Sequence, residues 1–341
     1  MRTWSAKIRA IAKQEMGHLA TVLNLLEAVG GGSYLNRIRF PSATGLYTPP
    51  IPFTLEPLTL ETISRFVQFE TPAHPVALAL GGLAPEPVVI EHVGQLYGDI
   101  RTGIGKIDET KLFIGRGSGQ DQASWSFNIT VAPVTNRETA FKAIDSIIVE
   151  GEGSPSGDDQ SHYGRFRSIQ TEYVQEHAAN PTFQPCRAVV ANPSTLAAPQ
   201  PDRPDTNAIT DPTTKDVAEL FNACYTTLLL ILVKYYRFEE TADNQEAIKG
   251  IAKVMMMAVL ARVGPLLSQL PTGSGKNAGP PFEIYTLPSL PNDRIASLTI
   301  LRERVDEAKT FAGDLATRVP KDGILLKVAE ALGNIRAAIP E

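Results

Sequence analysis

Trp4 to Val29 have the sequence WSAKIRAIAKQEMGHLATVLNLLEAV, and this stretch determines the expected fold. Steps of four and three residues along it place eight side chains on one face of an α-helix, namely Trp4, Ile8, Ile11, Glu15, His18, Val22, Leu25 and Val29. Six of the eight are apolar, so we expect this face to be buried. Glu15 and His18, in the middle, are a carboxylate and an imidazole that converge on one point. Burying an unpaired charge is costly unless a partner or a metal compensates it. Helical bundles hold carboxylate-bridged metals with such pairs, and a simple Glu15–His18 hydrogen bond is the alternative.

A second pair occurs in residues 158–175, DDQSHYGRFRSIQTEYVQ. Asp159 and His162 have the same spacing as the first pair, and Phe166, Ile169 and Tyr173 continue it, which predicts a second helical face that is otherwise apolar. Of the five histidines, only His18 and His162 have an acid three positions earlier. Glu150 or Glu152, just before this stretch, would supply a fifth ligand. Carboxylates and imidazoles without a thiolate suit iron or manganese, and zinc would also fit.

The rest of the chain predicts a mainly α protein with long proline-rich loops and a second helical lobe. The loops are residues 34–57 and 180–212, and residues 111–135 could form a loop or a short hairpin. Further helices are expected at Leu60–Phe69, Val88–Ile107, Phe141–Val149, Val217–Arg237, Asn244–Leu270 with a kink at Pro265, Asp293–Thr317 and Leu325–Ala338. We therefore expect a metal-binding domain at 1–195, a proline-rich linker at 196–215 and a helical lobe at 216–341.

Composition excludes several classes of protein. The 341 residues are 43% hydrophobic and have a formal net charge of −5, without the basic runs that nucleic acids or anionic membranes require. Uninterrupted apolar runs such as Leu228 to Val233 are too short to cross a bilayer. The N-terminus has no signal-peptide core, and two cysteines are too few for a disulfide framework. We expect a cytoplasmic protein that contacts neither nucleic acid nor membrane.

Several motifs together resemble a known family. They are QEMGHLATVLNLLEAVGG at 14–31, GQLYGDI at 94–100, FIG at 113–115, VEGEG at 149–153, SHYGRFRSI at 161–169 and NPTFQP at 180–185. In this order they resemble the ferritin-like domain of the iminophenylpyruvate dimer synthases, which include the chromopyrrolate-forming enzymes of bisindole pigment and indolocarbazole pathways. The resemblance covers roughly residues 5–195. The EMxH and GEG…SH motifs are fairly specific together, whereas the helical lobe is not.

The resemblance implies a non-haem metal site and an oxidative reaction. Glu15 and His18 match the EMxH motif of the family, Glu152 matches the acid of GEG, and His162 matches the histidine of SH. Asp159 is added from helix geometry alone. The implied chemistry is the oxidative coupling of two imines of aromatic α-keto acids at mono- or dinuclear iron, with a flavin-dependent amino-acid oxidase as the partner that supplies the imines. The family usually has a glutamate-bearing helix before EMxH, and only about fourteen residues precede Glu15 here. We expect that helix to come from another chain, unless the start is misassigned.

Two other functions stay open at this stage. The chain could be a metal-free or vestigial ferritin-like scaffold, an interaction subunit that a partner chain completes. It could also be a metal-dependent oxygenase of an unrelated substrate, such as a peptide or an alkaloid. Exposed proline-rich segments would suit a homo-oligomer.

Overall fold

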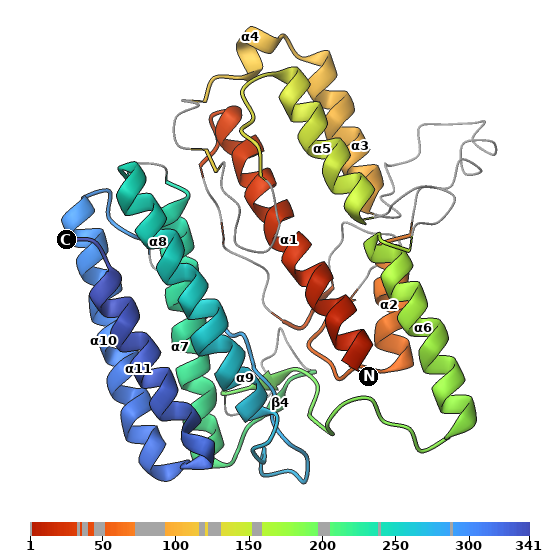
Figure 1. Ribbon diagram of the computed structural model, residues 1–341, viewed down its shortest axis with the longest axis vertical. Coiled ribbons are helices and arrows are strands. Elements are labelled where there is room, and N and C mark those ends of the chain that lie inside the picture. The colour runs from red at the N-terminus through yellow and green to blue at the C-terminus, as the bar shows by residue number, and fades with distance from the viewer. Residues whose placement is uncertain are drawn as a thin grey trace. The chain divides into compact units, whose positions relative to one another are not determined.

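The computed structural model describes residues 2–32, 35, 40–43, 52–71, 93–115, 120–121, 131–151, 159–196, 205–237, 240–286 and 289–341. Helices dominate these residues (Figure 1), which confirms the prediction of a mainly α protein. The strands among them are two residues long: β1 (Ser42–Ala43) pairs with β2 (Pro52–Phe53), and β3 (Pro193–Ser194) lies parallel to β4 (Asn207–Ala208). Most of the expected hairpin at 111–135 lies outside the described residues.

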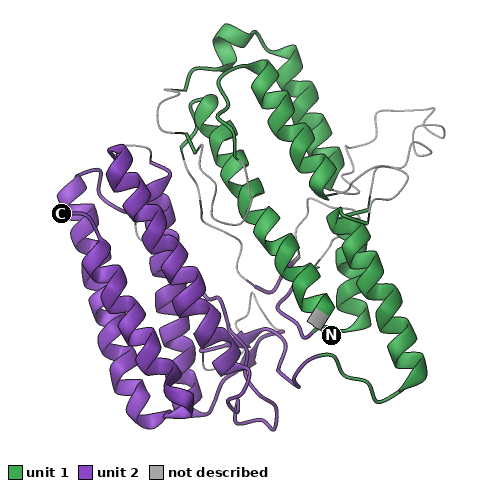
Figure 2. Cartoon of the chain, in the orientation of Figure 1, with its two compact units in different colours: residues 1–33, 43–52, 58–185 green, residues 34–42, 53–57, 186–341 purple. Residues whose placement is uncertain are grey.

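The chain forms two compact units, which Figure 2 shows in green and purple. The first contains residues 1–33, 43–52 and 58–185, and the second contains residues 34–42, 53–57 and 186–341. The boundary after Pro185 lies earlier than the predicted one at residue 195. The reason is that the segment before residue 212 pairs within the second unit, where the backbone N–H of Ile209 donates to the carbonyl of Ser194 at 2.8 Å.

The first unit is organised around its longest helix, α1 (Arg2–Ala28), as Figure 1 shows. Two pairs of helices pack on successive parts of α1: α2 (Leu60–Phe69) with α6 (His162–Ala179), and α3 (Val93–Lys106) with α5 (Arg137–Gly151). The bounds predicted for α2 are confirmed, and those for α3 and α5 agree closely except that residues 88–92 lie outside the described part. The short α4 (Glu109–Leu112) follows α3.

Each helix pair shares an apolar core with one end of α1. Near its N-terminus, Trp4 and Ile11 pack with Ile63, Phe166 and Ile169 of α2 and α6. Near the C-terminus of α1, a second cluster contains Ala28, Ile104, Val134, Ala140 and Ile144. Glu15 and His18 lie between these two cores, as the stripe of the sequence predicts.

The helix ends have local causes in the sequence. Ser161 caps α6 by accepting a hydrogen bond from the backbone N–H of Gly164, and Thr59 caps α2 in the same way. Gly30, with φ of +79°, ends α1, because this left-handed conformation is open to glycine at no steric cost. Gly115 crosses the end of α1 so closely that a Cβ atom there would lie 1.9 Å from the carbonyl oxygen of Glu27.

The second unit is a helical lobe, as expected. It contains α7 (Pro212–Tyr235), α8 (Ala242–Val254), the π-helical segment η2 (Met255–Leu260), α9 (Ala261–Leu267), α10 (Arg294–Arg318), the 3₁₀ turn η3 (Lys321–Gly323) and α11 (Ile324–Ala338). The helix predicted at Asn244–Leu270 is therefore three segments. Its irregularity is a π turn that precedes Pro265, which lies inside α9.

Two stretches of the second unit are long and apolar enough to span a membrane, Pro212–Tyr235 and Ala242–Leu267. Their most apolar windows are 67% and 44% buried within the protein, and α7 contacts α8, α9 and α10. We interpret both as core helices, because a helix that is apolar all round is satisfied by burial against its neighbours. The cytoplasmic location stays a prediction.

Candidate metal centre

Four helices of the first unit bring carboxylates and imidazoles to one place. Glu15 and His18 come from the middle of α1, and His162 is the first residue of α6. Glu70 is the residue that ends α2, and Glu150 lies in the last turn of α5. The site therefore forms where α2 and α5 end and α6 begins, all against the middle of α1.

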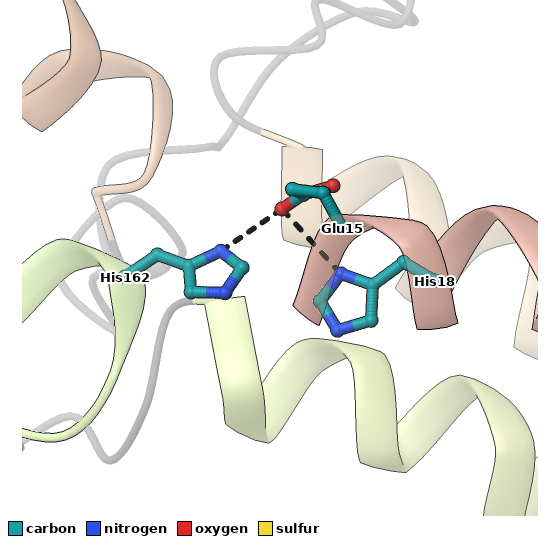
Figure 3. Close-up of side chains that lie close together, drawn as sticks. All are labelled: Glu15, His18 and His162. Carbon is teal, nitrogen blue, oxygen red and sulfur yellow. Dashed lines mark ion pairs between the residues drawn. The ribbon is translucent and has the colours of Figure 1, made fainter. Parts of the chain in front are cut away.

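One oxygen of Glu15 lies between the two imidazole rings, as Figure 3 shows. Its Oε1 atom is 2.9 Å from Nδ1 of His162 and 3.5 Å from Nδ1 of His18. The other ring nitrogen of His18, Nε2, is 3.0 Å from Oε2 of Glu150. Glu70 Oε1 is 3.6 Å from Nδ1 of His162. These contacts join three carboxylates and two imidazoles in one polar network.

His162 is the most deeply buried member of this network, with no exposed side-chain surface. Its Nε2 atom has no hydrogen-bond partner among the described residues. A buried polar atom without a partner costs about 1–3 kcal/mol, so this nitrogen is the kind of atom that a ligand would satisfy.

The network shifts the pKa values of its members in opposite directions. Burial alone would raise the pKa of the Glu15 carboxyl, but the two imidazoles outweigh burial and lower this pKa to about 2. Burial alone would favour neutral His18, but the Glu15 and Glu150 carboxylates outweigh it and raise the pKa of His18 to about 9. The pKa of His162 is raised for the same reason by Glu15 and Glu70. Without a metal, these shifts favour the ionised form of Glu15 and the protonated form of His18 at neutral pH.

The residues present fit a bound metal ion. Suitable ligand atoms of Glu15, His18 and His162 all lie within 4.8 Å of one another. Atoms that share one ion through bonds of about 2.1 Å are at most about 4.2 Å apart, so only small side-chain movements are needed. A pocket of about 50 Å³, lined by Glu15, His18 and Glu70 among others, adjoins them. A buried water needs only about 10–15 Å³ of cavity volume measured in this way, so the pocket has room for an ion and water.

The five residues predicted as ligands have different outcomes. The structure brings Glu15, His18 and His162 together, but their role as ligands stays a prediction. The expectation that Asp159 shares a helical face with His162 is wrong, because α6 begins at His162 and exposed Asp159 lies in the preceding turn. Glu152 lies outside the described residues.

Glu150, which the sequence left as an alternative to Glu152, pairs with His18. Glu70 was missed. It has no histidine three positions away, and its only signal in the sequence is an acid directly after a short amphipathic helix.

A family model described as ferritin-like matches residues 1–171. The chain belongs to the ferritin-like family. The match covers half of the chain and includes every residue of the candidate centre. This confirms the fold that the sequence motifs predict and agrees with a helical site built from carboxylates and imidazoles.

Two curated proteins are similar to this ferritin-like chain. One is named dichlorochromopyrrolate synthase, from Lentzea aerocolonigenes, and is 26% identical over an aligned length of 332 residues; the alignment covers 89% of this chain and 32% of the relative. The other is named 2-imino-3-(indol-3-yl)propanoate dimerase, from Chromobacterium violaceum, and is 24% identical over an aligned length of 285 residues; this alignment covers 81% of this chain and 27% of the relative. The chain thus spans about a third or less of the length of these relatives. No solved structure matches the chain significantly.

Proposed function

We propose that this ferritin-like protein is a non-haem metal enzyme of specialised metabolism, with iron as the expected metal, that couples two small aromatic imino acids by oxidation. The observation that carries this proposal is the convergence of Glu15, Glu70 and Glu150 with His18 and His162, whose buried Nε2 atom has no described partner. Carboxylate oxygens and imidazole nitrogens without thiolate suit iron or manganese.

The kind of reaction is supported by the names of the relatives. One name specifies the synthesis of dichlorochromopyrrolate, and the other specifies the dimerisation of a molecule with an indole ring and an imino acid end. Joining two such molecules with loss of one hydrogen from each is a two-electron oxidation, which requires an acceptor such as dioxygen or peroxide. A bound metal would supply the redox chemistry of this step. The flavin-dependent oxidase that would supply the imine stays a prediction.

The chain's own residues have defined tasks under this proposal. Glu15 and His18, on α1, and His162, on α6, would hold the metal, and Glu70 and Glu150 would complete or orient this set. Ligating histidines usually donate their second ring N–H to a carboxylate or carbonyl, which sets their orientation. The contact of 3.0 Å between His18 Nε2 and Glu150 Oε2 would serve this role.

Metal content tests the site directly. Freshly purified protein should contain about one or two equivalents of iron by plasma mass spectrometry, and His162→Ala should lose it. His177→Ala is the matched control, because His177 lies on the same helix α6 but is exposed at its far end. Full metal content in both His162→Ala and Glu15→Ala would contradict the site.

Activity and mass complete the test. The wild type should convert indole-3-pyruvate imine, generated in the assay by an amino-acid oxidase, into a coupled product with twice the mass of the imine less two hydrogens, and Glu15→Ala should not. A folded wild-type chain without metal would instead support the metal-free scaffold. In that case its mass in solution, alone and with cell extract, would show whether it associates with another chain.

A further inference from the structure

An apolar cavity lies in the first unit between α1, α3, α5 and the segment around α4. Its volume is about 380 Å³, and its surface is almost entirely hydrocarbon, with the rings of Tyr97 and Phe113 among aliphatic side chains. Cavities that bind small molecules usually measure about 300–1,000 Å³ and are mostly apolar with few polar groups. This cavity is within that range.

The apolar cavity continues the pocket of the candidate metal centre along the same helices. On α1, Glu15 and His18 line the polar pocket, and Val22 and Leu25, next on the same helical face, line the apolar cavity. Tyr97 of α3 lines both spaces. The two spaces are therefore successive parts of one track. From His18 to the end of the cavity at Val29 the helical rise gives a length of about 16 Å.

On α5 the two spaces follow in the same order. Ile147 and Ile148 line the pocket of the candidate metal centre, and Ile144, one turn earlier, lines the apolar cavity. Three separate helices thus place the two spaces in the same order, and the polar side chains of Glu15, His18 and Glu70 lie at one end of the track. A ligand that fits it has a polar group at one end and an apolar body at the other.

The side chains around the cavity lack the burial that a core stripe usually has. Trp4 and Ile11, at the start of the stripe on α1, are buried, but Val22 and Leu25 are only half-buried. At the edge of the cavity, Ile100 is 43% exposed. Covering apolar surface contributes about 25 cal/mol per Å², so an apolar molecule in this cavity would gain free energy from surface that the described protein leaves open.

We infer that this cavity binds the aromatic ring of the substrate, with the imino acid end of the same molecule directed past Tyr97 to Glu15, His18 and His162. The inference rests on the proposed function, which supplies the nature of the polar end. The cavity itself supplies the position of the ring and the residues that select it. Val22 and Leu25 of α1 and Gly103 of α3 form opposite walls of the space that the ring occupies.

Gly103 offers a sharp test of this assignment. It lines the cavity, and a Cβ atom added to it meets no other atom within 4 Å, so a side chain there would extend into open space. Gly98 lies on the same helix and has the same room for a Cβ atom, but it does not line the cavity. Gly103→Phe should therefore fill the cavity, and Gly98→Phe is its matched control. Val22→Phe fills the same space from α1 and keeps the test valid if Gly103→Phe fails to fold.

The experiment measures binding of indole-3-propionate to the full chain by isothermal titration calorimetry. This probe has the ring and the acid of the imino acid named for one relative but cannot be coupled. We expect binding to the wild type and to Gly98→Phe, and at least tenfold weaker binding to Gly103→Phe and Val22→Phe. Octanoate, a straight-chain acid, should bind more weakly than indole-3-propionate.

Three results would overturn the inference. They are the absence of binding to the wild type, an affinity of both filled variants equal to that of the wild type, and tighter binding of octanoate than of indole-3-propionate. Absence of binding combined with a lower melting temperature of Gly103→Phe would show that the protein's own chain fills the cavity. Metal content and coupling activity are measured on the same samples. Coupling that persists in both filled variants would reject the cavity and keep the proposed function. Probe binding that is lost in the filled variants, in a protein without metal or coupling, would reject the proposed function and keep the cavity as a site for an aromatic acid.

Discussion

Replacement of His18 by glutamine should change how the stability of the metal-free first unit depends on pH. The imidazole of His18 has only 10% of its surface exposed and lies between two carboxylates, which raise its pKa from 6.5 to about 9. A difference of about 2.5 pKa units corresponds to about 3 kcal/mol of stability. Because the side chains of Glu15 and Glu150 are 51% and 42% exposed, solvent screens part of this interaction, and the figure is an upper limit.

The sign follows from the direction of the shift. Because the folded pKa is above the unfolded one, His18 contributes its full stabilisation below pH 6.5, where it is protonated in both states. The contribution declines as the pH rises from 6.5 and is lost above about 9. The difference in unfolding free energy between wild type and His18→Gln should therefore shrink by up to about 3 kcal/mol from pH 6 to pH 10.

Urea unfolding in the presence of a chelator, followed by tryptophan fluorescence, measures this difference. Of the two tryptophans, Trp4 is buried in the apolar core of the first unit, so its fluorescence reports the unfolding of that unit, and Trp125 lies outside the described residues. His177→Gln, an exposed change on α6, should show no such trend. In the Glu150→Gln background, the stabilisation that His18 contributes should be lost at a lower pH than in the wild type. The reason is that this variant lacks one of the two carboxylates that raise the pKa of His18. A constant difference between wild type and His18→Gln across this range would refute the reasoning.

Three further predictions concern both units. Metal binding at pH 7 should release at least one proton, because His18 must lose the proton that it keeps at this pH through its raised pKa. Calorimetry in buffers of different ionisation enthalpy measures the number of protons released, and the absence of release would contradict the raised pKa of His18. Asn222→Ala should destabilise the second unit by about 1–3 kcal/mol. The reason is that the buried carboxylate of Glu283 loses a donor at 3.1 Å and the backbone N–H of Glu283 loses an acceptor at 3.0 Å. Thermal unfolding followed by circular dichroism measures this loss of stability. In the native protein a thiol reagent should modify the exposed Cys186 but not Cys224, because burial raises the pKa of the Cys224 thiol to about 12. Two fast-reacting thiols would contradict this burial.

The helices show how far local pattern reaches. The bounds of α2 were predicted at Leu60–Phe69, and those of α10 and α11 nearly so, because an amphipathic stripe and a capping residue are properties of neighbouring positions in the chain. Asp159 shows the limit of the same argument. Its spacing to His162 suited a helix, but Ser161 accepts the hydrogen bond that starts α6, and this leaves Asp159 outside it. A local cap outweighed a periodic pattern.

The candidate centre divides in the same way. Glu15, His18 and His162 could be found from the sequence because each acid or imidazole interrupts an apolar stripe, and an unpaired charge on a buried face requires a compensating group. Glu70 could not be found, because nothing near it in the sequence relates it to His162. Its contact depends on where α2 stops and where α6 begins.

The amino-acid sequence by itself determined the mainly α architecture, the stripe of α1 and the Glu15–His18 pair within it, since these depend on side chains a few residues apart. Only the tertiary structure decided that α2 and α5 end beside this pair, that His162, Glu70 and Glu150 join it, and that the same stripe continues into an apolar cavity. The physical reason is that helix periodicity depends on local backbone geometry, whereas the meeting of three helix ends against the middle of α1 depends on long-range packing of two separate apolar cores along α1.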